Sequence, residues 1–337
     1  MEHFDIPIVL ITFKREKVVD ILKRIAVIKP QKLYILSDAG RTDEEKEAVN
    51  KCRIAVEQEI NWPCEVIKNY AIENKGVYEN IAGGAHWVFE RESKAIFLED
   101  DNLPEVSFFW FCKEMLNKYE NNESILWVCG TNYLEKYKTK NNESYVFTKH
   151  MLPCGWASWS NKFLKFYDGN IEKCEDSKIL KIVKKNYINK KVYKQYKLSW
   201  QRERRRIKKG EKPLSWDYQM DFSIKSNGLY GICPKYNQIK NIGVDEYSIH
   251  GGNSFSKVMT RRFCGMDTFP IEFPLIHPKT INVDEKFEKK IGKIILYPFK
   301  TRLVIYTSNL IRKLFSISDD ISIKDYFFRK EKKYEKE

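Results

Sequence analysis

An alternation of apolar runs and amphipathic segments near the N-terminus constrains the fold of this chain more than any other feature. Residues 6–13 form a continuous, β-branched apolar run, which is expected of a strand buried on both faces. A helix-like segment follows at 16–28, with its apolar residues on one face. Further strands are expected at 32–36, 64–69, 95–98 and 125–130, and further helices at 42–58, 76–91 and 108–119. This order predicts an α/β fold with a mostly parallel, Rossmann-like sheet flanked by helices, and with ligands at the carboxyl ends of the strands.

Changes in composition suggest how the rest of the chain is organised. We expect one sheet-based domain over residues 1–280, made of two halves, 1–130 and 131–280. Within the second half, residues 173–212 hold 16 Lys and Arg against 4 acids, with apolar residues at helical spacing, which predicts a basic helical insertion. Residues 281–337 are expected to form a basic, amphipathic C-terminal extension.

The net charge and the cysteine content indicate which binding partners and which cellular compartment to expect. With 60 Lys and Arg against 46 Asp and Glu, the net charge is +14, so the surface should attract nucleic acid, acidic lipid headgroups or phosphorylated substrates. The eight cysteines include no C-x-x-C pair, which argues against a structural zinc site and favours a reduced protein. Neither a secretory pattern nor a membrane-spanning apolar stretch is found, so we expect a cytoplasmic protein.

Three consecutive acids, Glu99, Asp100 and Asp101, directly follow the strand expected at 95–98. Adjacent carboxylates repel one another, and the end of a strand within a domain is an unfavourable place for three of them unless a cation is bound. Mn²⁺ and Mg²⁺ take oxygen ligands and commonly bridge carboxylates to phosphates. The triplet therefore predicts a site for a metal ion and a diphosphate. The alternative is a solvated acidic turn that caps the next helix.

Two earlier strand ends also carry charged residues. Arg15 follows the first strand, where its cation could meet a diphosphate, and Asp38 follows the second, where its carboxylate could accept hydrogen bonds from a ribose or a base. No G-x-G-x-x-G motif follows the first strand, so a nucleotide-sugar donor fits better than NAD. Taken singly, both residues could be ordinary surface residues. Three charged turns at one edge of a sheet favour a site.

Asp217 lies in the segment Leu214–Gln219, among aromatic residues that follow the basic insertion. A carboxylate in such a setting suits general-base catalysis, in which it takes a proton from a reacting hydroxyl group. The alternative is structural, because Ser215 or Asp217 could cap the N-terminus of a helix. The residue types alone leave both interpretations open.

A tryptophan-rich turn at 153–159 and a polar loop at 241–254 carry the remaining candidates. The turn could wall a sugar site by stacking, or its tryptophans could simply pack in the core; its candidates are Gly155, Trp156 and Trp159. The loop could be a lid whose His250 touches the metal ion or the diphosphate, or it could be a solvated loop.

Taken in order, these residues resemble the GT-A nucleotide-sugar glycosyltransferases, and most of all the N-acetylglucosaminyltransferase I family. The resemblance covers roughly residues 6–255 and lies in the order of the motifs. Ile8–Arg15 is similar to the family's first strand and its Arg-bearing turn, Ser37–Gly40 to its nucleoside-binding turn, and Phe97–Asp101 to its Glu-Asp-Asp form of the DxD motif. The family's acceptor-side turn, catalytic pair and donor-closing loop are similar to Cys154–Trp156, Trp216–Asp217 and Gly243–Gly251.

The resemblance implies a metal-dependent, inverting glycosyltransferase that uses a UDP-sugar, with UDP-N-acetylhexosamine as the first expectation. Asp101 would bind Mn²⁺ or Mg²⁺, and Asp217 would be the catalytic base. Residues 1–130 would be the nucleotide-binding half and 131–280 the acceptor half. Donor contacts would come from Arg15, Asp38, Glu99, Asp100, Trp216 and His250, and acceptor contacts from Gly155, Trp156 and Trp159. The family's uracil-neighbouring histidine falls near Gly84 here, with His86 two residues on.

A bacterial-type cytoplasmic enzyme that builds a surface polysaccharide or lipooligosaccharide fits the chain best, because we expect no N-terminal membrane anchor of the kind found in the family. A lipid-linked saccharide acceptor would lie at an anionic membrane surface, where each nearby Lys or Arg contributes about 1 kcal/mol of attraction. The basic segments at 202–212 and 285–313 would then dock the protein on the membrane, and deleting 285–337 should release it. The alternative is a solvated face of ordinary helices.

Two other functions fit parts of the sequence. A sugar nucleotidyltransferase would keep the fold and the metal ion, but no Gly-rich N-terminal signature for a nucleoside triphosphate is present. A nucleic-acid-binding module would use the basic insertion at 173–212, but the chain offers no recognised nucleic-acid motif, and we expect no nucleic-acid partner.

Overall fold

The computed structural model of the chain describes residues 4–244, 254, 258–318, 321–324 and 326–327. The chain forms two compact units, Met1–Gly292 and Lys293–Glu337. The sequence placed a boundary at residue 280, before helix α10 (Glu285–Ile295). The boundary between the two compact units instead falls within this helix, after Gly292. Each unit is described by itself.

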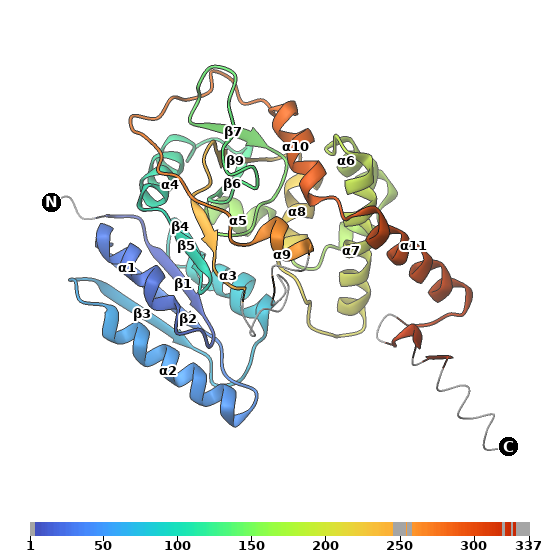
Figure 1. Cartoon of the computed structure of the whole chain (residues 1–337), viewed down its shortest axis with the longest axis horizontal. Helices are drawn as coiled ribbons and strands as arrows, with labels where there is room; N and C mark the ends of the chain where they lie inside the picture. The colour runs from blue at the N-terminus through green and yellow to red at the C-terminus, as the bar shows by residue number, and fades with distance from the viewer. Residues whose placement is uncertain (1–3, 245–253, 255–257, 319–320, 325, 328–337) are drawn as a thin grey trace. The chain divides into compact units, whose positions relative to one another are not determined.

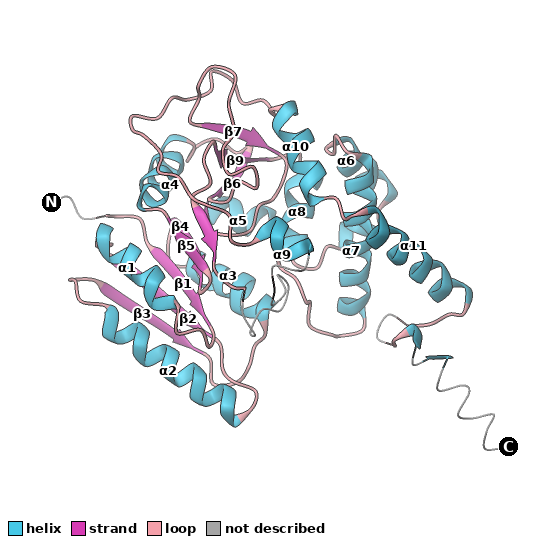
Figure 2. Cartoon of the chain, viewed as in Figure 1, coloured by secondary structure: helices cyan, strands magenta, loops and turns pink. Residues whose placement is uncertain are grey.

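An eight-stranded sheet forms the centre of the first unit, with the strand order β3-β2-β1-β4-β8-β6-β9-β7 (Figures 1 and 2). Its strands are β1 (Ile8–Thr12), β2 (Lys32–Ser37), β3 (Glu65–Tyr70), β4 (Lys94–Glu99), β6 (Ile125–Cys129), β7 (Tyr145–Thr148), β8 (Trp156–Trp159) and β9 (Tyr230–Pro234). The four strands β3, β2, β1 and β4 are parallel, and β8 and β7 run against their neighbours. Because β6 and β9 are parallel to each other, the sheet is mostly parallel, which confirms the expected α/β fold class.

Helices cover both faces of the sheet (Figure 2). Three of them share one hydrophobic core with β1, β2 and β4; they are α1 (Val18–Ile28), α2 (Asp43–Glu59) and α4 (Val106–Lys118). On the other face, α3 (Gly84–Phe89) and α5 (Ser160–Phe166) meet, where the rings of Phe89 and Phe163 lie 5.0 Å apart. Thr42 caps α2 as its sequence predicts, because its hydroxyl accepts the Glu45 N–H at 3.3 Å. The helix expected at 76–91 is interrupted, since a π-helical turn at Glu79–Gly83 precedes α3.

A small second sheet lies directly after the acidic triplet. Strand β5 (Asn102–Pro104) pairs antiparallel with β10 (Ile239–Asn241), so that Asn102 faces Asn241. This pairing joins the turn that follows β4 to the start of the loop expected as a lid. The sequence did not predict either strand, because each is only three residues long.

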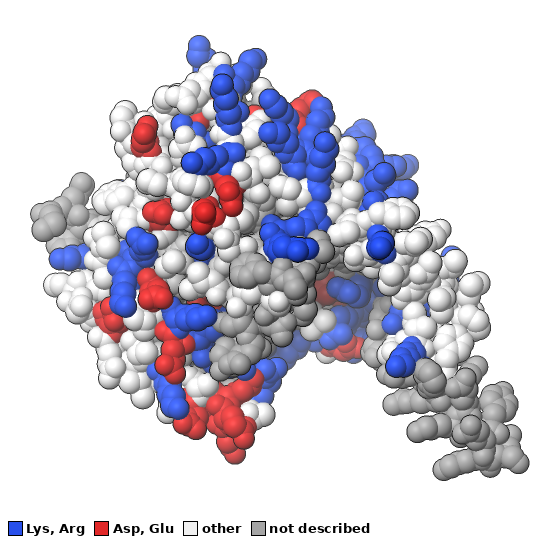
Figure 3. Space-filling view, in the orientation of Figure 1, with Lys and Arg blue, Asp and Glu red and all other residues white. Residues whose placement is uncertain are grey.

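The basic insertion folds into helices, as expected. It contains the 3₁₀ turn Glu172–Glu175, α6 (Ser177–Lys185) and α7 (Lys190–Lys208). Its buried side chains, among them Val183 and Trp200, face inward, and most of its lysines are exposed. Figure 3 shows Lys and Arg side chains gathered over α6 and α10. Helices α6 and α7 pack on α8 (Asp217–Ser226), and α9 (Val258–Phe263) is a further short helix.

Buried hydrogen bonds connect α10 to the end of β7. The carboxylate of Glu288 accepts the hydroxyl of Thr148 and, at 2.9 Å, the N–H of Lys149. The His150 ring lies 3.3 Å from the same carboxylate. On the neighbouring helix α8, Lys225 pairs with Asp221 in a fully buried ion pair.

The second unit contains α11 (Phe299–Leu314), and none of the residues of this helix is buried. Within the described part of the chain, no helix is both long enough and apolar enough to cross a lipid bilayer.

Candidate functional site

The acidic triplet joins the carboxyl ends of two neighbouring strands. Glu99 ends β4, and the carboxylate of the next residue, Asp100, reaches the turn after β1. One of its oxygens accepts the Phe13 N–H at 2.9 Å, and the other accepts Nη1 of Arg15 at 2.8 Å. The residues expected at two strand ends therefore meet, and Asp100 fixes the position of the Arg15 guanidinium.

The triplet places three neighbouring carboxylates at one strand end, and Arg15 brings a guanidinium to two of them. Nη1 of Arg15 lies 3.6 Å from the half-buried carboxylate of Asp101. Burial and the charge of Asp100 nevertheless raise the pKa of Asp101 to about 6. Burial and the charges of Asp101, Asp100 and Asp217 raise the pKa of Glu99 well above its usual range. A cation at this place would relieve that repulsion.

The chain after β10 packs directly against Asp101. The Ile242 N–H donates to the backbone carbonyl of Asp101 at 2.8 Å. A Cβ atom at Gly243 would lie 2.3 Å from Oδ2 of Asp101, so only glycine permits this approach. The loop expected as a lid thus begins beside the triplet. Its residues 245–253, and with them His250, lie outside the described residues.

Asp217 is the first residue of α8. Ser215 Oγ accepts the Tyr218 N–H at 3.1 Å and its hydroxyl donates to the Asp217 carboxylate. Ser215 therefore caps the helix, as the structural alternative proposed, and Asp217 is held by that cap without being the cap itself. Trp216, the residue before Asp217, packs 5.7 Å from Trp156, and Trp156 stacks on Phe97 of β4, two residues before Glu99. Aromatic rings therefore join the start of α8 to the end of β4, although the two come from different halves of the chain.

The basic insertion holds the segment that carries Asp217. Nε1 of Trp200, a buried residue of α7, donates to the Tyr218 carbonyl at 3.1 Å. The carboxylate of the buried Glu203 accepts the Leu214 N–H at 2.8 Å. Both contacts flank Asp217 in the sequence, so the insertion determines where this carboxylate lies.

The three candidate tryptophans lie in an aromatic core layer. Trp156, which is 1% exposed, is stacked between Phe97 at 3.9 Å and Trp127 at 4.4 Å, measured between ring centroids. Trp159 is equally buried, and Trp216 packs 5.7 Å from Trp156. The core-packing alternative therefore describes these rings, because neighbouring strands and helices cover them.

Gly155 connects the tryptophan-rich turn to the acidic triplet. Its N–H donates to Oδ1 of Asn102 at 2.8 Å, and Nδ2 of Asn102 donates to Asp101. Gly155 has a φ of 60°, and a Cβ atom there would lie 2.5 Å from Ile239 of β10. Glycine is therefore required where this turn, β5 and β10 meet.

Asp38 organises a loop at the neighbouring strand end. Its buried carboxylate accepts hydrogen bonds of 2.7–3.0 Å from the backbone N–H groups of Ala39, Lys75 and Gly76 and from the Asn74 side chain. A carboxylate offers about four acceptor positions, and protein donors use them here. Asp38 thus shapes the loop after β3, and a contact between Asp38 and a nucleotide stays a prediction.

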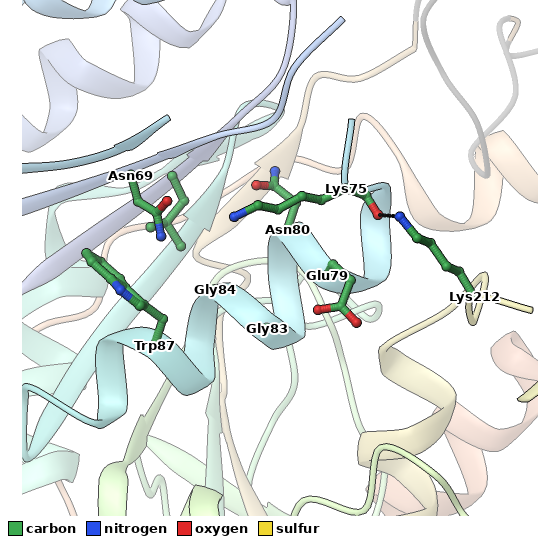
Figure 4. Close-up of a pocket in the computed structure, with 9 residues that line it drawn as sticks. Asn69, Lys75, Glu79, Asn80, Gly83, Gly84, Trp87 and Lys212 are labelled. Carbon is green, nitrogen blue, oxygen red and sulfur yellow. Dashed lines mark hydrogen bonds between the residues drawn. The ribbon is translucent and has the colours of Figure 1, made fainter. Parts of the chain in front are cut away.

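Beside this loop, a pocket of about 290 Å³ opens at the carboxyl ends of β2 and β3 (Figure 4). Its lining residues are Leu36, Asn69, Lys75, Glu79, Asn80, Gly83, Gly84, Trp87 and Lys212. Figure 4 shows the Trp87 ring and the Asn69 amide on one side of the pocket and Lys75 and Lys212 on the other. An aromatic ring and two amides suit a planar, polar ligand such as a nucleoside, and the Glu79 carboxylate offsets part of the positive charge of the two lysines. Nζ of Lys212 donates to the Lys75 carbonyl at 3.3 Å. His86 does not line the pocket, because its ring packs 5.4 Å from that of Phe163.

Comparison with known proteins assigns the chain to no family. No protein-family model matches the sequence, and no curated protein matches it. Solved structures do align with the chain, and among them are UDP-glucose pyrophosphorylase complexed with UDP-glucose and the apo enzyme. The first has a TM-score of 0.34 and 8% sequence identity over 71% of this chain and 94% of that chain. The second has a TM-score of 0.33 and 8% identity over 70% and 93%. Alignments this weak define neither a family nor a reaction, so the function is inferred from the site.

Asp101 is the residue that could hold a divalent cation. Among the described residues, no three His, Cys, Asp or Glu side chains are arranged as a complete metal-binding group. An ion held by Asp101 would therefore take most of its ligands from water or from a phosphate, as Mg²⁺ and Mn²⁺ commonly do. Such an ion would counter the burial and the charge of Asp100, which raise the pKa of Asp101.

Sequence analysis did not identify two further residues, Asn102 and Tyr133. Asn102 starts β5 and binds both Asp101 and Gly155. Its only signal in the sequence is that it is a polar residue directly after the triplet. Tyr133 follows β6, and burial together with the charges of Cys154 and Asp217 raises its pKa. The position of Tyr133 after an apolar strand is the same signal that identified Arg15.

Proposed function

We propose that this chain is a metal-dependent glycosyltransferase that transfers a sugar from a UDP-sugar to a saccharide acceptor with inversion at the anomeric carbon. The observation that supports it most directly is that the ring of Trp216 packs on Trp156, which stacks on Phe97, so that the residues just before Asp217 and just before the acidic triplet belong to one aromatic layer. One set of carboxylates can serve the leaving nucleotide while a separate carboxylate takes up a proton. That division of roles is what a direct displacement between two sugars requires.

The donor would lie between the triplet and the pocket beside Asp38. Asp101 would hold a Mn²⁺ or Mg²⁺ ion, which when bound supplies positive charge against the departing diphosphate. Arg15, fixed by Asp100, adds a guanidinium at the same strand end. The nucleoside would occupy the pocket lined by Trp87 and Asn69, and Glu99 would face the donor sugar.

Asp217 would be the catalytic base. Its carboxylate would accept the proton of an acceptor hydroxyl while that oxygen forms a bond to the anomeric carbon and the bond from that carbon to the diphosphate oxygen breaks. The proton ends on Asp217 and the electron pair on the diphosphate. Attack from the face opposite the leaving group inverts the configuration. An N-acetylhexosamine donor and an acceptor from surface polysaccharide or lipooligosaccharide synthesis are part of this proposal.

Nucleotidyl transfer is the second candidate, because the same carboxylates and Arg15 could serve it. UDP-glucose pyrophosphorylases, the enzymes of the two solved structures above, belong to this class. In that reaction Asp217 would have no acceptor hydroxyl to deprotonate. The two functions therefore differ in what Asp217 does and in whether pyrophosphate is released.

Calorimetric titration with UDP and UDP-sugars, with Mn²⁺ and with a chelator, tests the donor site. We expect Mn²⁺-dependent UDP binding that is lost in Asp101→Ala. Asp217→Asn should bind UDP like the wild type and lose about 100-fold or more in sugar transfer or in donor hydrolysis. Glu123→Gln, which alters an exposed acid paired with Lys165 on the surface, is the matched control and should change neither quantity.

Two results would count against glycosyl transfer. UDP binding that is indifferent to the chelator and to Asp101→Ala would remove the donor site. Pyrophosphate release from UTP and a sugar phosphate that persists in Asp217→Asn would instead favour nucleotidyl transfer.

A further inference from the structure

Helix α11 presents an apolar stripe that none of the described residues of its own unit covers. Residues spaced by four, three, four and four positions lie on one face of a helix. In α11 these are Phe299, Leu303, Tyr306, Leu310 and Leu314, whose exposed fractions range from 48% to 70%. Large apolar side chains in a continuous, exposed row mark an interaction surface.

The neighbouring helix α10 has no such surface, although both come from the same basic stretch of sequence. Phe287 and Ile291 of α10 are 0% exposed, and the Phe287 ring packs 5.1 Å from that of Tyr137. Glu288 is held by the polar network at the end of β7. The membrane-docking segment expected at 285–313 therefore has its exposed row of apolar side chains in α11, because those of α10 are buried.

The charges of α11 restrict the partner. The helix holds four cations and no acidic residue. Arg302 donates to the Tyr297 carbonyl at 3.0 Å and Arg312 to that of Ile321 at 2.8 Å, so both have structural contacts. Lys300 and Lys313 are exposed. An anionic surface would be attracted to such a helix, whereas a second copy of α11 would bring four cations against four.

We propose that α11 lies in the surface of an anionic lipid bilayer, with its apolar stripe in the acyl region and its lysines at the headgroups. An amphipathic helix rich in basic residues and carrying aromatic side chains on its apolar face has this property. Its 16 residues are too few and too polar to span the bilayer. The proposal is independent of the sugar-transfer chemistry, because it rests on α11 alone.

Co-sedimentation of the full chain with vesicles tests the proposal. One set of vesicles contains phosphatidylcholine only, and the other contains about one-third phosphatidylglycerol. We expect binding to the anionic vesicles and little to the neutral ones. Leu303→Ser with Leu310→Ser should weaken binding by about tenfold or more, because two apolar side chains no longer enter the bilayer. Lys300→Gln with Lys313→Gln should weaken binding to the anionic vesicles by about tenfold.

Val27→Ser with Ile54→Ser is the matched control, since these two apolar residues are as exposed as those of the stripe but lie on α1 and α2. This variant should bind vesicles like the wild type. Unchanged UDP binding and thermal unfolding in every variant show that the fold is intact, and they separate this test from that of the proposed function.

Three outcomes would overturn the proposal. The first is vesicle binding that persists in Leu303→Ser with Leu310→Ser. The second is equal loss of binding in Lys181→Gln with Lys184→Gln, which would place the contact on α6. The third is a dimer in sedimentation velocity that disappears in the leucine variant, which would show that a second copy covers the stripe.

Discussion

Asp38 and Asp217 are both acids that follow apolar or aromatic segments, yet their surroundings give them different capacities. Asp38 accepts four hydrogen bonds from protein donors and holds a loop. The Asp217 carboxylate accepts the hydroxyl of Ser215, the residue that caps α8. A catalytic base must keep an acceptor position for the substrate's proton. The four protein donors on Asp38 therefore make Asp38 a structural residue, whereas catalysis by Asp217 stays a prediction.

Lys149 gives a prediction at the scale of one residue. Burial, together with the charge of Lys225, lowers its pKa to about 8, although Glu288 acts in the opposite direction. Between pH 8 and pH 10 the unfolded chain therefore binds more protons than the folded chain does at this lysine, so its contribution to the free energy of unfolding rises with pH. Relative to Lys149→Met, the wild type should gain on the order of 1 kcal/mol between pH 7 and pH 9.5.

Denaturant unfolding of both proteins at the two pH values measures this difference. The comparison with Lys149→Met removes the effect of the buried cysteines, such as Cys112, whose raised pKa lowers the stability of both proteins at high pH. Lys181→Met, at an exposed site on α6, is the control, and its offset from the wild type should not depend on pH. A constant offset for Lys149→Met as well would show that Lys149 keeps its charge in the fold.

Helix α7 acts at the scale of an element, since it supports α8 from outside the sheet. Its inward face carries Trp200, whose ring also packs against Phe222 at 5.2 Å. Its outward face carries lysines and arginines in solvent. The basic insertion therefore has two separate properties: its apolar side positions Asp217, and its charged side sets most of the net charge.

Trp200→Ala gives a prediction for this element. The cavity left by the indole ring should lower the free energy of unfolding by about 3 kcal/mol or more. Because the Tyr218 carbonyl also loses its donor, the start of α8 should shift and sugar transfer should fall further than UDP binding does. Leu198→Ala, on the exposed side of α7, should cost less than about 1 kcal/mol and leave transfer unchanged. Equal effects of the two substitutions would contradict the supporting role.

The whole molecule consists of a sheet-bearing unit and a small C-terminal unit. The first has its own hydrophobic core, to which α10 adds Phe287 and Ile291. Deleting 285–337, as the sequence suggested, would remove these buried side chains together with Glu288. A deletion that tests the C-terminal unit alone has to begin after α10.

A chain that ends after Leu296 should fold by itself. We expect cooperative thermal unfolding and UDP binding like those of the full chain, and loss of binding to anionic vesicles. A chain that ends after Asp284 is the control, and it should be less stable because it lacks α10. Aggregation or non-cooperative unfolding of the longer chain would show that the first unit depends on the second.

Local sequence patterns were sufficient to predict the alternation of strands and helices, the parallel arrangement of the first four strands and the edge of the sheet at which Arg15, Asp38 and the triplet lie. These features follow from local hydrophobic periodicity, because an apolar run fixes a strand and the next polar residue marks its end. Local patterns also indicated that the basic insertion is helical.

Contacts between distant segments settled which of these residues lie together. Trp156 lies in the core because β8 pairs with β4, and Trp216, next to Asp217, packs on Trp156, and no local pattern encodes either contact. The sequences of α10 and α11 have similar amphipathic patterns, so they did not predict that α10 is buried and α11 exposed. The physical reason is that periodicity determines which face of an element is apolar, whereas contacts between distant segments determine whether anything covers it.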